Sequence, residues 1–215
     1  ATRNVAVGSG AGGGTTSSGG VFIGNFAGSA ANVDNVVLIG RDAGASVTGA
    51  GNLAIGYTAL GVHTTGARNI AIGEGAMDDT DAGSNSLGSA DNIFMGHNAG
   101  GGTWTDVASN RNVTLGNYTM DAATAGALDN VAIGHYALSS VTSGDFNTVL
   151  GSNAGLSLTT GANNICIGYL AGDTMTGNGA VIAIGTSAGQ AINHTDADGT
   201  VAIGFKALEN LRFFK

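Results

Sequence analysis

A short motif recurs along almost the whole chain, and it restricts the fold more than any other feature of the sequence. Its pattern is a hydrophobic tripeptide followed by a glycine and, three residues after that glycine, an alanine. We call the glycine the anchor, and consecutive anchors lie 16 to 23 residues apart. The anchors are Gly8, Gly24, Gly40, Gly56, Gly73, Gly96, Gly116, Gly134, Gly151, Gly168, Gly185 and Gly204.

A regular period of this length is typical of one small unit stacked on copies of itself. We therefore predict an all-β fold, a parallel β-roll (solenoid) of about twelve coils of 16–23 residues, over residues 1–208. Residues 209–215 leave the pattern, and we predict that they begin a neck, a cap or the next domain.

Composition excludes several other classes of protein. The chain has 39 glycines and no proline, but its 43% apolar content is too high for a disordered linker, and it lacks the Gly-X-Y order of collagen. A net charge of −8 without a basic run makes nucleic acid an unexpected partner. No apolar run reaches membrane-spanning length, so no membrane insertion is expected. Cys166 is the single cysteine, which excludes an internal disulfide framework and suits a small buried hydrophobe.

The tripeptide predicts a strand that is apolar on both faces. The residues three and one before the anchor are nearly all large aliphatics, such as Ile70 and Ile72, and residues two apart share one face of a strand. We expect that face to form the coil interior. The residue between them is mostly small and apolar, as at Ala54, Ala71 and Ala132. Since a strand that is apolar on both faces is covered on both, we expect a second chain to cover these small residues.

Two further positions are predicted to be structural. An anchor glycine in every repeat indicates a backbone conformation or a close approach that a Cβ atom would forbid. Asparagine stands four residues before the anchor in eight repeats, where stacked amides could hydrogen-bond along the rod and satisfy turn backbone. The representatives that we single out are Gly56, Gly73, Gly134 and Gly168 among the anchors, and Asn52, Asn69, Asn130 and Asn164 among the asparagines.

Repeats of the form Asn-Val-Ala-Ile-Gly-x-x-Ala-Leu resemble the β-roll repeats of trimeric autotransporter adhesin heads, the YadA-like family. They resemble still more the Asn-x-Ala-Ile-Gly-x-x-Ala-Leu arrays of bacteriophage tail fibres. The resemblance covers residues 4–208. It implies a left-handed roll, three chains intertwined or packed around one axis as a homotrimer, and attachment to a host surface.

From this resemblance we expect a structural and adhesive rod of a phage tail fibre, carried on the virion and joined to further fibre or neck domains. Its partner would be a host surface glycan or protein receptor. The alternative is the head of a bacterial trimeric adhesin on the cell surface. A polysaccharide-degrading tailspike is a third reading, but acids on unrelated turns do not supply an acid and a nucleophile at a defined separation. We therefore expect no enzyme, no catalytic residue and no cofactor.

The lengthened fifth and sixth repeats hold the candidate receptor site. Their variable loops, residues 78–91 and 101–111, are consecutive and so are expected to lie side by side, and binding residues often sit on loops of a rigid scaffold. Trp104, the only tryptophan, is expected to be exposed there among acidic side chains. The alternative is that Trp104 only holds the loop in place. The predicted receptor or glycan contacts are Asp78, Asp79, Asp81, Trp104, Thr105 and Asp106.

Other candidate sites have simpler explanations. Asp196 and Asp198 crowd one turn, as calcium ligands do, but they do not complete a calcium-loop pattern, so a solvated acidic turn is expected and no metal. His97 and His135 each follow an anchor glycine, but they belong to the sixth and eighth repeats. We expect them to be two separate surface histidines.

Overall fold

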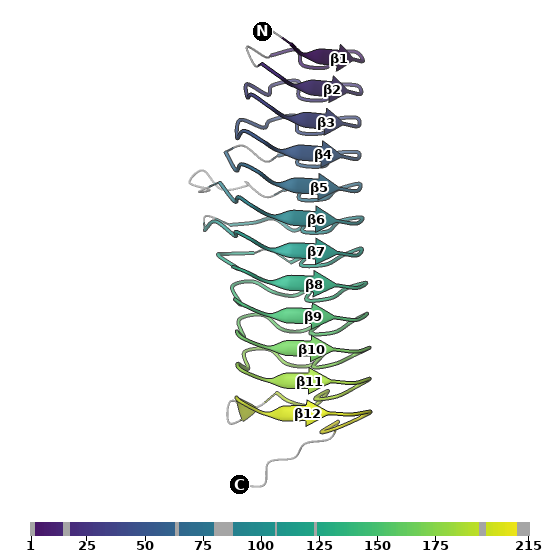
Figure 1. Cartoon of the computed structure of the whole chain (residues 1–215), viewed down its shortest axis with the longest axis vertical. Coiled ribbons are helices and arrows are strands. Elements are labelled where there is room, and N and C mark those ends of the chain that lie inside the picture. The colour runs from purple at the N-terminus through teal and green to yellow at the C-terminus, as the bar shows by residue number, and fades with distance from the viewer. Residues whose placement is uncertain are drawn as a thin grey trace.

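A computed structural model describes residues 3–14, 18–62, 65–79, 88–105, 107–122, 124–193 and 197–209. Within these ranges the chain forms twelve strands of three residues, stacked in chain order into a rod (Figure 1). The strands are β1 (Val5–Val7), β2 (Val21–Ile23), β3 (Val37–Ile39), β4 (Leu53–Ile55), β5 (Ile70–Ile72), β6 (Ile93–Met95), β7 (Val113–Leu115), β8 (Val131–Ile133), β9 (Thr148–Leu150), β10 (Ile165–Ile167), β11 (Ile182–Ile184) and β12 (Val201–Ile203).

All the strands belong to one parallel sheet whose spatial order is the order of the sequence. Equivalent residues pair throughout, so that Ala71 of β5 lies opposite Phe94 of β6 although 23 residues separate them. The longer repeats therefore leave the strand register unchanged. The predicted parallel β-solenoid is confirmed. At about 4.8 Å per coil, twelve coils make a rod about 55 Å long.

The expected assignment of the two strand faces is wrong. In the strands from β2 to β12, the middle residue is buried and the residues on either side of it are half-buried or exposed. Ala54, Ala71 and Ala132 thus line the coil interior, with none of their surface exposed. The large aliphatics, such as Ile55 and Leu115, face outward instead. We call the side chains three and one residues before each anchor the outer strand face.

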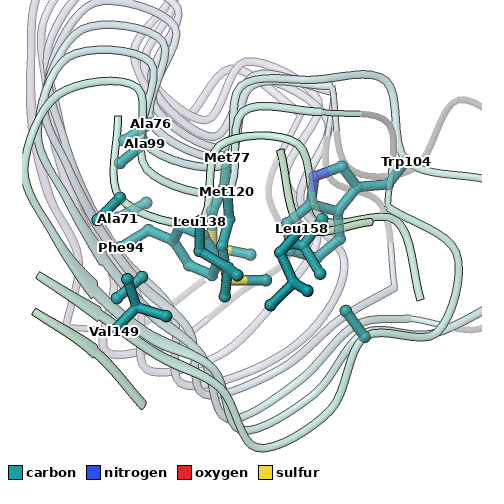
Figure 2. Close-up of a cluster of buried hydrophobic side chains, with 14 of the residues drawn as sticks. Ala71, Ala76, Met77, Phe94, Ala99, Trp104, Met120, Leu138, Val149 and Leu158 are labelled. Carbon is teal, nitrogen blue, oxygen red and sulfur yellow. The ribbon is translucent and has the colours of Figure 1, made fainter. Parts of the chain in front are cut away.

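The interior of each coil is filled jointly by the middle strand residue and by side chains that follow the anchor. In most coils the space beside the middle residue is filled by the side chain four residues after the anchor or, where that residue is glycine, by a larger middle residue. Ala71 is thus paired with Met77, whereas Phe94 is paired with Gly100. A Cβ atom at Gly100 would lie 2.7 Å from the Phe94 ring. Figure 2 shows Ala71, Phe94 and Val149 on one wall, with Met77, Met120 and Leu138 pointing toward them.

The anchor glycines have both of the features predicted for them. Each has a positive φ, between +121° and +143°, a region that side chains other than glycine's rarely adopt. In every coil that has a coil after it, a Cβ atom on the anchor would also meet the next anchor's carbonyl. At Gly134, for example, it would lie 2.5 Å from the oxygen of Gly151. The anchors therefore let successive coils approach closely just after each strand.

The asparagine ladder also runs as predicted. The Oδ1 atom of Asn52 accepts hydrogen bonds from the backbone N–H of Asn69 at 2.8 Å and from its Nδ2 at 3.2 Å. The Nδ2 atom of Asn52 donates to the carbonyls of Gly49 and Gly66. The same arrangement continues through buried Asn92, Asn112, Asn130, Asn147 and Asn164. Each amide thus links two coils and satisfies turn carbonyls inside the rod.

Candidate functional site

The lengthened turns of the fifth and sixth coils do lie side by side where the structure describes them. The Trp104 backbone N–H donates to the Asp79 carbonyl at 2.9 Å, and the Thr103 Oγ1 donates to the Asp79 Oδ2 at 2.6 Å. The Asp79 carboxylate is thus engaged in joining the two turns. Asp81 and Asp106 lie outside the described residues.

The expected exposure of Trp104 is wrong. Only 1% of its surface is exposed, and its ring packs edge-on against Phe94 with 5.6 Å between the ring centroids. Figure 2 shows the indole pointing into the interior from the end opposite the strand wall. The lengthened turn thus brings a large apolar ring into the interior of the sixth coil, where it packs as a core residue. Among the described residues, its Nε1 atom has no hydrogen-bond partner. Trp104 is therefore a core residue and cannot serve as a surface contact.

The remaining loop candidates are polar groups at the border of this core. Burial raises the pKa of Asp78, although a hydrogen bond from Thr58 acts in the opposite direction. Thr105 is exposed, and its backbone N–H donates to the carbonyl of Thr124 in the next coil at 2.9 Å. Asp78, Asp79 and Thr105 thus lie along one stretch of surface. The Trp104 ring, which was predicted to lie beside them, is buried in the core instead.

Of the two candidate metal ligands, Asp196 and Asp198, the structure describes only Asp198. The Asp198 Oδ1 accepts a hydrogen bond from the backbone N–H of Gly179 at 2.9 Å, so this carboxylate stabilises a turn of the preceding coil. Asp196 falls in an undescribed segment. In the described ranges no three His, Cys, Asp or Glu side chains come together as a metal site would need.

Cys166 occupies the middle position of β10 and is fully buried. Burial raises the pKa of its thiol to about 12, so the reactive thiolate is nearly absent at neutral pH. The residue is therefore a small core hydrophobe, as the sequence predicted.

A row of aromatic and polar side chains follows the strands, and it was not among the predicted sites. We call the two residues after each anchor the post-anchor edge. All four tyrosines of the chain lie on this edge, together with His97, His135, Phe26 and Phe205. The tyrosines are Tyr57, Tyr118, Tyr136 and Tyr169.

Four of these rings form one cluster across the sixth, seventh and eighth coils. Tyr118 and Tyr136 are stacked, with ring centroids 4.8 Å apart and an angle of 10° between the planes. His97 lies edge-on to Tyr118 at 5.1 Å, and His135 lies edge-on to Tyr136 at 4.3 Å and to Tyr118 at 6.0 Å. Tyr118 thus joins the two histidines that we expected to be separate. We call His97, Tyr118, His135 and Tyr136 the ring cluster.

Neighbouring polar groups hold the ring cluster in place. The Oδ1 of Asn117 accepts a hydrogen bond from the His97 backbone N–H at 2.9 Å. The backbone N–H of Tyr118 donates to the His97 carbonyl, and that of Tyr136 donates to the Asn117 carbonyl. Burial raises the pKa of Asp121, and the nearby His97 partly opposes this effect. The sequence signal for the ring cluster is that the second residue after the anchor is tyrosine in two consecutive repeats.

The structure alone defines the class of the chain, a parallel β-solenoid. No family model matches it, and no curated protein or solved structure matches it either. Across the described residues, no helix has the length and apolar character needed to cross a membrane.

Proposed function

We propose that this chain is a structural and adhesive rod of a bacteriophage tail fibre, in which three copies lie parallel around one axis and contact the host cell surface. The site of action would be the virion, outside the cell. The rod would act by binding and would carry out no chemical reaction.

The main support for the proposed trimer is the apolar outer strand face. It runs along the whole sheet, and at every described coil its side chains are half-buried or exposed. Every residue on it is apolar except Thr148. Parallel sheets are normally covered on both faces, and a continuous exposed apolar surface marks an interaction site. A second and third copy would cover this face with the same aliphatic side chains.

The adhesive role draws on the resemblance of the repeats and on the form of the scaffold. Hydrogen bonds between consecutive coils fix the backbone along the rod, so that its turns and edges project from a rigid support. Binding residues are often found on such supports. The post-anchor edge, with its ordered rings, is the stretch of surface best suited to this role.

Two measurements on the full chain test the proposal. Gel filtration with light scattering should give about three times the chain mass of 20.9 kDa. Fluorescently labelled protein should bind cells of at least one strain in a panel of bacteria. A folded monomer would contradict the trimer, and absence of binding to every strain would contradict adhesion. Release of new reducing ends from a surface polysaccharide would instead favour a degrading tailspike.

A further inference from the structure

We infer that the ring cluster and the edge around it form a binding strip for an uncharged polysaccharide that runs along the rod. The inference rests on the proposed adhesive function and assigns it a place and a ligand class. Four observations support it: the type of side chain, the lack of charge, the order of the rings and their continuation along the rod.

The type of side chain changes abruptly at the anchor glycine. Before it, every residue of the outer strand face except Thr148 is apolar, which suits contact with another protein surface. After it, from the sixth to the tenth coil, rings with polar atoms and amides predominate, as at His97, Tyr118 and Asn117. Tyrosine and histidine present an apolar body and a polar tip. A sugar has the same mixed character, with C–H groups on its ring and hydroxyls around it.

The residues of the post-anchor edge carry no formal charge where the rings gather, and the nearby charged group is the Asp121 carboxylate beside His97. From the sixth to the eleventh coil, none of the twelve residues that directly follow the anchors is Asp, Glu, Lys or Arg. Charge returns at both ends of this stretch, with Glu74 in the fifth coil and Lys206 in the twelfth. Binding an acidic polysaccharide would require basic side chains, as binding nucleic acid does. An uncharged polymer is the ligand that meets no electrostatic opposition here.

The rings are ordered before any ligand arrives. Each ring of the cluster touches at least one other, and the coil-to-coil hydrogen bonds fix the backbone beneath them. A prearranged surface loses less conformational entropy on binding than loose side chains do.

The strip also continues beyond the cluster. Tyr169, which is 52% exposed, extends the edge two coils past Tyr136. Because equivalent residues repeat with the spacing of the coils, a ligand that spans several coils must itself be extended.

The test compares the parent protein with two variants on an array of purified bacterial surface polysaccharides, both neutral and acidic. Tyr118→Ala combined with Tyr136→Ala removes the stacked pair. Phe146→Ala is the matched control, because Phe146 is 55% exposed but precedes β9 and so lies on the other side of the strands. We expect the parent to bind a neutral polysaccharide, the double variant to lose about tenfold or more in affinity, and the control to bind as the parent does.

A second readout does not depend on the variants folding. Bound polysaccharide should protect Tyr118 and Tyr136 of the parent from nitration, while Tyr57, three coils from Tyr118 and four from Tyr136, should stay reactive. Mass spectrometry of peptides would locate the modified rings. Equal nitration with and without the polysaccharide would overturn the inference.

The other outcomes separate this inference from the proposed function. If the double variant binds polysaccharide and cells as the parent does, the strip is wrong and adhesion stands. Binding to acidic polysaccharides alone would overturn the ligand class. If the double variant dissociates into monomers, the edge is a contact between chains, and the inference fails. If the parent binds neither cells nor any polysaccharide, both the proposed function and the inference fail.

Discussion

At the scale of single residues, the fold depends on backbone conformations that most side chains avoid. In a typical coil the anchor, the second and fourth residues after it and the residue five before it have positive φ, as Gly134, Tyr136, Leu138 and Asp129 illustrate. Leucine or methionine occupies the fourth position after the anchor where the interior needs a larger side chain. Only the anchor combines a positive φ with a backbone contact that leaves no room for a Cβ atom.

Substitution of one anchor tests this distinction. Gly134→Ala should lower the free energy of unfolding by about 2–4 kcal/mol, because it strains the backbone and brings a methyl group against the Gly151 carbonyl. Gly177→Ala is the control, since its Cβ atom would lie 3.4 Å from the hydroxyl of Thr160, an ordinary contact. Thermal melts at one protein concentration would measure both. Equal melting temperatures would show that the anchor tolerates a side chain.

At the scale of the coil, stability comes from filling the interior and satisfying its polar groups. The middle strand residue and the residue four after the anchor share one space, so a large side chain at one position accompanies a small one at the other. Where both are small, a third residue fills the gap. Beside Cys166 and Gly172 that residue is Met175, whose Sδ lies 2.7 Å from the place where a Cβ atom of Gly172 would be.

Exchanging the large and the small side chain between these two positions of one coil tests whether they share one space. Leu38→Ala alone should cost about 2–5 kcal/mol through the cavity that it leaves. Gly44→Leu alone should also destabilise, because a Cβ atom there would lie 2.6 Å from Leu38. The double variant reproduces the next coil, which has Ala54 and Leu60, and should be more stable than either single variant. Additive losses in a double-mutant cycle would contradict a shared space.

Removal of one asparagine from the ladder is the second test at this scale. Asn112→Ala should cost about 3 kcal/mol or more, because the buried Ala127 carbonyl and Asn130 N–H of the next coil lose their partner and the Asn92 Oδ1 loses one of its donors. Asn193→Ala removes an exposed amide whose Oδ1 accepts a bond from Thr176, and it should change stability by less than about 1 kcal/mol. Urea unfolding of both variants provides the comparison. A small loss at Asn112 would mean that water replaces the ladder.

At the scale of the whole molecule, the rod has a filled interior and an apolar side that is open to solvent in the single chain. This arrangement reverses the one that we expected from the sequence, and it changes which substitutions should separate folding from assembly. A charge at Ala71 would now be buried inside the coil and should prevent folding itself. A charge on the outer strand face should instead act on the contact between chains.

Ile133→Asp tests the proposed interface directly. Ile133 lies on the outer strand face at the end of β8, where a carboxylate would be desolvated against other copies. Light scattering should show loss of the trimer. Thr160→Asp, in an exposed turn, should assemble as the parent does. If Ile133→Asp remains a trimer of parent stability, the chains meet through another surface.

The sequence by itself determined the repeat, the strands, their parallel stacking, the anchor glycines and the asparagine ladder. Each of these follows from a regular spacing or from a residue type that has one physical reason to recur. Tertiary structure decided which strand face is inside, because both faces are apolar and a period of two cannot distinguish them. It also decided that Trp104 fills the interior and that Tyr118 joins His97 to His135. Those outcomes depend on the width of each coil and on which side chains stacking brings together across coils.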